Sequence, residues 1–155
     1  MLAIKYSIGF TILLCTYFHF SNYKTYPVFN KASEDYLLVK TIQDNDLQKS
    51  ISKGKEVYID FCIQCHSANG KGDGQNFPPL DGSDWLTKKT NESLHAIKFG
   101  QSGEILVNGK KFNNSMPSMG LSNQEVADVM NYIRNSWSNK NPKIITFKQV
   151  EAIKE

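Results

Sequence analysis

The sequence predicts an all-α fold that contains one small β-hairpin. Apolar residues recur at helical spacing in two segments, one ahead of residue 62 and one after Ser122. Between these segments Asn108-Gly109 separates two short runs, and this dipeptide is the strongest short-range hairpin signal that a sequence offers. We therefore expect helices to supply most of the fold and the hairpin to precede the last long helix.

The first long helix is expected to run directly into a Cys-x-x-Cys-His motif. Its apolar stripe consists of Leu47, Ile51, Gly54, Tyr58 and Phe61. This spacing places the five residues on one face of a helix. The helix would therefore deliver Cys62, the first residue of the motif, to the inside of the fold.

The motif Cys62-Ile63-Gln64-Cys65-His66 indicates covalent attachment of a c-type haem. Two sulfurs one helical turn apart can form thioethers with the two vinyl groups of one porphyrin, while the adjacent imidazole binds the iron. A thioredoxin-like dithiol would need a surrounding βαβ pattern, and a zinc site would need a second pair of ligands. The sequence has no second Cys-x-x-Cys.

An irregular loop should follow the motif. The glycine-rich run 69–74 and the pair Pro78-Pro79 disfavour regular structure. The run lacks the Lys-Ser/Thr ending of a phosphate loop and the terminal carboxylate of a calcium loop. Asn91 is then expected to cap a short helix that ends at Phe99, before Gly100, with Leu94 and Ile97 on its inner side.

Met116 is the expected sixth ligand of the iron. It lies in the polar stretch 113–117, and Pro117 biases it toward an extended backbone, which suits a side chain presented from a loop. Met119 is an alternative ligand, and either methionine could instead fill a gap in the core. Ligation by His66 and Met116 would raise the reduction potential and leave no iron site for a substrate. The expected function is electron transfer.

Ser122 and Glu125 form a capping box that begins the last long helix. Its apolar stripe consists of Val126, Val129, Met130, Ile133 and Trp137. Because Met130 lies on this stripe, we expect it to pack in the core and not to bind iron. A second capping box, from Thr146 to Gln149, predicts a short helix within a C-terminal extension, residues 141–155.

The N-terminus has the features of an export signal, residues 1–22. Lys5 precedes an apolar run, 8–20, that is short for a membrane span. The segment around residues 17–22 has no clear cleavage pattern, so a retained anchor is the alternative. Cys15 would be the acceptor of a lipid, but Leu14 stands where lipoproteins have a small residue. Residues 23–46 lack a sustained periodic pattern and are interpreted as a linker.

Composition and charge exclude several classes of function. The chain has 155 residues, a formal net charge of +3 and 40% hydrophobic residues, which is typical of a globular protein and not of a disordered or polytopic membrane protein. The lysine pairs Lys88-Lys89 and Lys110-Lys111 do not form a basic stripe interleaved with aromatic residues. No nucleic-acid partner is therefore expected.

The order of these features, over residues 47–140, resembles bacterial class I monohaem cytochrome c. In that family a glycine and an aromatic residue of the first helix pack against an aromatic residue of the last, and Gly54, Tyr58 and Tyr132 occupy those places. The family also has a proline whose carbonyl accepts a hydrogen bond from the proximal imidazole, then a leucine against the haem. Pro78 and Leu80 match them.

This resemblance implies the class I cytochrome c fold, helices wrapped around one covalent haem c. It implies an electron carrier and not an enzyme, located in the periplasm or on the outer face of the cytoplasmic membrane, with a redox protein as donor and another as acceptor. The segments 77–86, 107–109 and 135–137 are similar to cytochrome domains that are fused to, or work beside, copper nitrite reductases and quinoprotein dehydrogenases. A subunit of such a complex, tethered to the membrane through the N-terminus, is therefore an alternative, and a haem peroxidase or sensor is another.

Overall fold

A computed structural model describes residues 31–155. The expected export signal, with Lys5 and Cys15, therefore lies outside the described residues. By its internal packing the chain divides into two units, Met1–Asp35 and Tyr36–Glu155. None of the helices in residues 31–155 is both long enough and apolar enough to cross a membrane.

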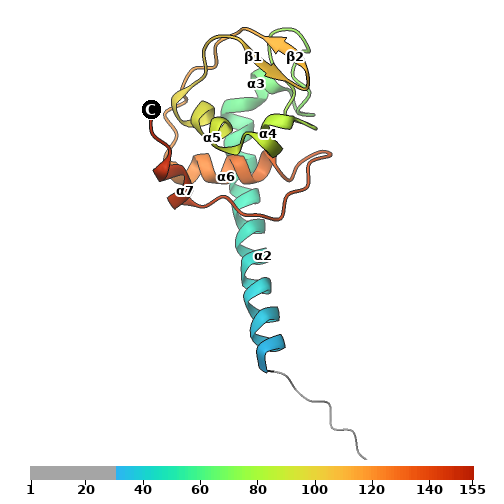
Figure 1. Ribbon diagram of the computed structural model, residues 1–155, viewed down its shortest axis with the longest axis vertical. Helices are drawn as coiled ribbons and strands as arrows, with labels where there is room; N and C mark the ends of the chain where they lie inside the picture. Colours follow the sequence, from blue (N-terminus) through green and yellow to red (C-terminus); the bar gives the residue numbers. More distant parts are fainter. Residues whose placement is uncertain (1–30) are drawn as a thin grey trace, which may run out of the picture. The chain divides into compact units, whose positions relative to one another are not determined.

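Within residues 31–155 the fold is helical apart from one two-stranded sheet, so the predicted all-α class with a small hairpin is confirmed (Figure 1). The elements are α2 (Lys31–Val57), the π-helical η1 (Tyr58–Cys62), α3 (Ile63–His66), α4 (Asp84–Lys88), α5 (Thr90–Phe99), β1 (Ile105–Val107), β2 (Lys110–Phe112), α6 (Asn123–Ile133) and α7 (Phe147–Ala152).

Helix α2 begins earlier than the sequence pattern indicates. The segment 23–46 was expected to lack a sustained helix, but it is helical from Lys31 onward. No glycine or proline interrupts the chain between Lys31 and Lys53, so nothing breaks the helix even where its side chains stay in water. Residues 31–46 are all exposed, and burial begins at Leu47.

Helix α2 packs against α6 through Gly54. A Cβ atom at this position would lie 1.9 Å from the carbonyl oxygen of Asp128, so only glycine permits so close an approach of the two backbones. One turn later the rings of Tyr58 and Tyr132 lie 5.4 Å apart. The predicted contact between the first and last long helices is thus present, and Figure 1 shows α6 crossing α2.

Buried polar groups join the same two helices to the C-terminal segment. The hydroxyl of Ser50 donates a hydrogen bond to the carboxylate of Asp128. The amide of Asn131 donates to the Ser50 oxygen at 2.9 Å and to the carbonyl of Ile145 at 2.8 Å, and it accepts from the N–H of Ile145 at 2.7 Å. Because these groups are buried, their bonds fix one relative position of the three segments.

The helix that leads to the cysteines is not a regular α-helix throughout. Residues Tyr58–Cys62 form a π-helical turn. Its hydrogen bonds join residues five positions apart instead of four, so the side chains that follow are rotated about the axis relative to those of α2. As a result Phe61 is 42% exposed, and its expected place on the buried stripe is wrong. The hydroxyl of Tyr58 donates to the carbonyl of Ser67 at 2.7 Å, which ties this turn to the loop after His66.

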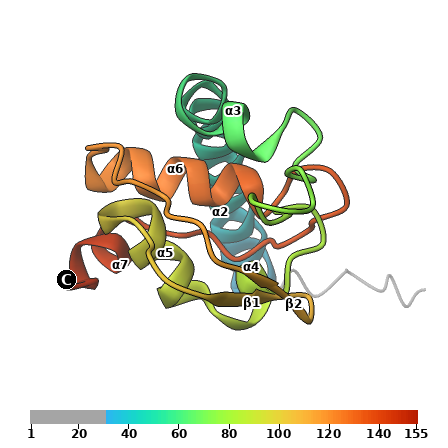
Figure 2. The ribbon, with the colours of Figure 1, turned by 90° about the horizontal axis from the view of Figure 1, so that it is seen from above.

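The hairpin forms as predicted. Strands β1 and β2 are antiparallel, with Val107 opposite Lys110 across the turn. Asn108 and Gly109 both have positive φ, 50° and 77°, the conformation that favours Asn-Gly at this kind of turn. Figure 2 shows the hairpin lying beside α4, and Asn108 makes the connection, since its side chain accepts from the N–H of Asp84 at 2.9 Å.

Helix α5 ends at Phe99 with Gly100 as its C-cap, as predicted, but it begins at Thr90. Asn91 is therefore not the cap: Lys89, the single residue between α4 and α5, holds the N-cap position. Leu94 is buried in the core, and Ile97 packs against it.

The capping box of Ser122 and Glu125 begins α6, as predicted. The helix ends at Ile133, so the expected place of Trp137 on its stripe is wrong. Trp137 instead has a φ of 56°, and its indole N–H donates to the carbonyl of Ala68 at 3.0 Å. Met130 is fully buried in the hydrophobic core.

The C-terminal extension packs against the rest of the fold. Thr146 and Gln149 form the predicted capping box at the start of α7, and Val150 is completely buried among residues of the core. The ammonium group of Lys98 donates to the carbonyls of Val150 and Ile153, at 3.0 and 3.1 Å. The carbonyl of Val150 also accepts from the N–H of Ile153 at 3.1 Å, so Lys98 adds a second donor there and ties α5 to the C-terminal end of α7.

Candidate functional site

One large cavity lies between α3, the loop 76–80, α5, the hairpin and α6. Counted with its open mouth, it has a volume of about 1180 Å³. Its walls are mostly apolar, with side chains such as Leu86, Ile97 and Phe112. Six residues singled out from the sequence line it: Cys62, Cys65, His66, Pro78, Leu80 and Met116. Residues up to 54 positions apart in the chain thus meet around one space.

His66 is held in one orientation at the wall of this cavity. Its imidazole is buried, and Nδ1 lies 3.0 Å from the carbonyl oxygen of Pro78. Since a carbonyl can only accept, Nδ1 carries the proton, and Nε2 is left as a free lone-pair donor. Burial lowers the pKa of His66, against a smaller opposing effect of the Pro78 bond, so the ring is neutral at pH 7. A neutral imidazole with an oriented second nitrogen is suited to bind a metal.

The two cysteines next to His66 do not form a disulfide. Burial, and next the proximity of Cys65, raises the pKa of Cys62 to about 11. Redox-active dithiols have the opposite property, a lowered thiol pKa, so this environment disfavours the thioredoxin-like hypothesis. In residues 31–155 no group of three His, Cys, Asp or Glu side chains is arranged to hold a metal ion.

The loop that carries Pro78 is ordered by Asp73. One carboxylate oxygen of Asp73 accepts from the backbone N–H groups of Gln75, Asn76 and Phe77, at 2.9, 2.8 and 2.8 Å. These bonds hold the pKa of Asp73 well below its usual range.

Gly72 brings this loop back to the motif. It has a φ of 62°, its N–H donates to the carbonyl of His66 at 3.0 Å, and a Cβ atom there would lie 2.1 Å from the carbonyl oxygen of Phe77. Gly72 is therefore needed for close packing of the backbone.

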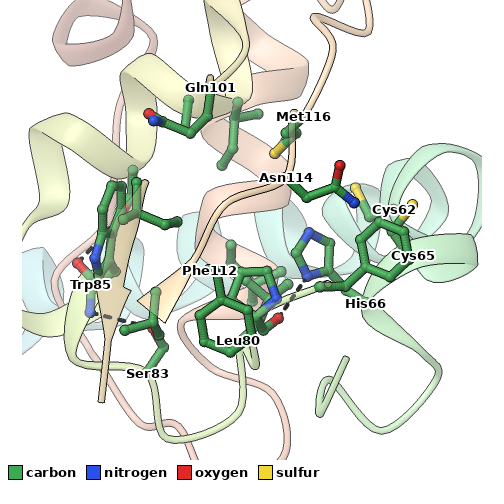
Figure 3. Close-up of a pocket in the computed structure, with 18 of the residues that line it drawn as sticks. Cys62, Cys65, His66, Leu80, Ser83, Trp85, Gln101, Phe112, Asn114 and Met116 are labelled. Atoms are coloured by element: carbon green, nitrogen blue, oxygen red, sulfur yellow. Dashed lines mark hydrogen bonds between the residues drawn. The ribbon is translucent and has the colours of Figure 1, made fainter. Parts of the chain in front are cut away.

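Met116 enters the cavity from the loop after the hairpin. Its backbone pairs with Gln101 in a single antiparallel bridge, with both N–H to carbonyl distances at 2.8 Å. Figure 3 shows the thioether of Met116 and the imidazole of His66 facing the same space, with the two cysteines beside His66. Met119 also lines the cavity, whereas Met130 does not.

Several residues of the cavity were not singled out as site residues from the sequence. Trp85, Gln101, Phe112 and Asn114 all line it (Figure 3). Trp85 is fixed by its indole N–H, which donates to the carbonyl of Leu106 at 2.8 Å and so ties α4 to β1. Phe112 could have been identified from the sequence, because it is the apolar residue at the end of a predicted hairpin strand. No local pattern indicated that Gln101 or Asn114 would line the cavity.

Comparison with known proteins identifies related sequences over the same region. The family model described as "Cytochrome c" matches residues 51–137. The cytochrome c subunit of a quinone-dependent alcohol dehydrogenase from Gluconacetobacter polyoxogenes is 34% identical over 106 residues, which cover 66% of this chain and 22% of the relative. Cytochrome c-552 of Thermus thermophilus is also 34% identical, over 64% of this chain and 78% of its own length.

A third relative is the cytochrome c subunit of gluconate 2-dehydrogenase from Pantoea cypripedii, which is 31% identical over 73% of this chain and 28% of its own length. The chain thus spans roughly a quarter of each dehydrogenase subunit and most of the Thermus protein.

Proposed function

The chain belongs to the cytochrome c family, and from this premise we propose that it is an exported monohaem cytochrome that carries single electrons to or from a redox enzyme. Members of the family hold haem c covalently, and the cavity suits this group. It offers two adjacent thiols, an oriented neutral imidazole and apolar walls. When bound, the haem supplies reversible one-electron chemistry at its iron.

The protein side chains would hold this group in three ways. Cys62 and Cys65 would form the thioethers, and His66 would bind the iron through Nε2. The hydrogen bond from Nδ1 to Pro78 keeps the ring from rotating and makes the iron-bound nitrogen more basic. Leu80, beside Pro78, would pack against the macrocycle and exclude water.

Met116 would be the ligand on the other side of the iron. The observation that carries the proposal is the meeting of this thioether with the Cys-x-x-Cys-His motif in one cavity. Two protein ligands would leave the iron no site for a reactant, which suits a carrier and not a catalyst. The same argument disfavours a haem peroxidase or sensor, for which the sixth position must be open.

The donor and the acceptor would be redox proteins. Two exposed apolar side chains, Ile59 and Phe61, lie within the π-helical turn next to Cys62, and Phe61 also lines the cavity. An exposed apolar surface at the attachment site suits a small, transient redox encounter. The dehydrogenase subunits among the relatives support a second candidate, in which the chain is the electron-transfer subunit of such a complex.

Location and domain organisation are part of the proposal. Residues 1–22 would direct export to the periplasm or the outer face of the cytoplasmic membrane, and a retained leader would tether the domain there. Residues 47–140 would hold the haem, and residues 23–46 would join them to the leader. The extension 141–155 would complete the same domain, since Ile145 and Val150 lie in its core. A mature protein that stays with membranes after a salt wash would favour the tethered form, and a freely soluble one would exclude it.

The visible spectrum of the oxidised, exported protein tests the function directly. We expect a weak far-red band from sulfur-to-iron charge transfer, lost in Met116→Ala and kept in Met119→Ala. A band that survives in Met116→Ala but disappears in Met119→Ala would assign the ligand to Met119. The absence of the band from the unaltered protein would refute methionine ligation altogether.

A further inference from the structure

The segment that carries Met116 is fixed to the end of α5 at the methionine and again two residues later. Gln101 and Met116 exchange two backbone hydrogen bonds of 2.8 Å each. Two residues further on, the hydroxyl of Ser118 donates to the carbonyl of Lys98 at 2.9 Å. Residues 98–101 therefore hold residues 116–118 by hydrogen bonds at both ends of this short segment.

Gly100 lies at the centre of this contact. A Cβ atom at this position would be 2.8 Å from the carbonyl oxygen of Met116 and 3.1 Å from the amide nitrogen of Ser118. Its φ of 94° and ψ of 172° also fall in a region that is almost restricted to glycine. The missing side chain thus permits the backbone of the methionine segment to lie directly against the end of α5.

The register of this pairing decides where the methionine side chain points. In an antiparallel pair, a shift by one residue turns every side chain to the opposite face. A shift that placed residue 117 opposite Gln101 would lose a hydrogen bond, because proline has no N–H. The bond from Ser118 to Lys98 opposes movement of the segment in either direction.

We propose that Gly100 and Ser118 are positioning residues that set the register of the methionine segment, so that the thioether of Met116 faces the cavity. This inference rests on the proposed role of Met116 as iron ligand. Neither residue would touch the iron. Their effect would be on how firmly Met116 occupies the sixth position.

Two glycines of the same loop provide a matched test. Gly103 also has a positive φ, 83°, but an added Cβ atom there would have no neighbour within 4 Å. Both Gly100→Ala and Gly103→Ala introduce backbone strain, while only Gly100→Ala introduces the clash with Met116. Ser118→Ala removes the hydroxyl, and Ser118→Thr keeps it.

The measurements are the far-red band of the oxidised holoprotein and its titration with imidazole, which competes for the sixth position. In Gly100→Ala we expect a weaker band and roughly tenfold tighter imidazole binding, equivalent to about 1.4 kcal/mol. In Ser118→Ala we expect about fivefold tighter binding, since one hydrogen bond is lost. Gly103→Ala and Ser118→Thr should match the unaltered protein.

Thermal unfolding followed by far-ultraviolet circular dichroism separates positioning from general stability. Similar melting temperatures for Gly100→Ala and Gly103→Ala, with different imidazole affinities, would support the inference. Equal imidazole affinities in the two variants would overturn it, as would a fall in stability alone. If Gly100→Ala does not fold, the imidazole affinities of Ser118→Ala and Ser118→Thr are compared instead. Equal affinities of these two variants would then overturn the inference. If the unaltered protein shows no far-red band, the proposed function fails first.

Discussion

At the scale of single residues, Asp73 organises the loop that presents Pro78 to His66. Its carboxylate accepts three backbone hydrogen bonds and lies entirely at the surface. The bonds favour the ionised form, so they are strongest while the carboxylate is charged. One exposed acid thereby holds three successive N–H groups of the loop that leads to Pro78.

The lowered pKa of Asp73 predicts a defined pH dependence of stability. A carboxyl group with a folded-state pKa below its unfolded value stabilises the fold fully above the unfolded value, about 4, and this contribution is lost as the pH falls toward the folded-state value. Asp73→Asn removes the charge but keeps one oxygen acceptor. We expect the variant to be less stable than the unaltered protein at pH 7, with the difference shrinking at pH 3.

Urea unfolding of both holoproteins at the two pH values measures this difference. Comparing the variant with the unaltered protein at each pH cancels the contribution of the other carboxylates. A difference in stability that is the same at pH 7 and pH 3 would show that the charge of Asp73 is not stabilising.

At the scale of elements, the crossing of α2 and α6 depends on one position. Because a Cβ atom at Gly54 would lie 1.9 Å from the Asp128 carbonyl oxygen, Gly54→Ala must push the helices apart. We expect a loss of about 3 kcal/mol or more in the free energy of unfolding. The control is Lys53→Ala, an exposed neighbour on the same helix. Equal stabilities of these two variants in urea would contradict the close contact.

The sequence alone could predict the elements whose signals are local. Asn108-Gly109 makes its hairpin, Ser122 begins α6 and Gly100 ends α5, because in each case the decisive hydrogen bonds or dihedral angles lie within a few residues. The Cys-x-x-Cys-His motif identified its end of the cavity for the same reason. Met116 could be singled out because Pro117 follows it.

Other features depend on contacts between distant segments, so no local pattern could indicate them. The π-helical turn at residues 58–62 accompanies the bond from Tyr58 to Ser67 and the packing of its ring against Tyr132. Trp137 leaves the helix because its ring packs over Gly70, where a Cβ atom would lie 2.6 Å from it. The pairing of Gln101 with Met116 likewise forms only once the hairpin has brought the segments together.

At the scale of the whole molecule, the C-terminal extension is part of the folded domain. Val150 is completely buried, so Val150→Ala should lower the free energy of unfolding by about 2 kcal/mol through the cavity it leaves. Glu151→Ala alters an exposed residue of the same helix and serves as the control. Urea midpoints that are equal for the two variants would show that α7 adds nothing to the stability of the fold.

We propose above all that the protein fills both axial positions of the haem iron, with His66 and Met116. Exposing the chemically reduced, purified holoprotein to carbon monoxide tests this claim most directly, with Met116→Ala as the open control. We predict that the visible spectrum of the unaltered protein stays the same, while that of Met116→Ala shifts. A shift in the unaltered protein would show an open iron site and contradict ligation by both His66 and Met116.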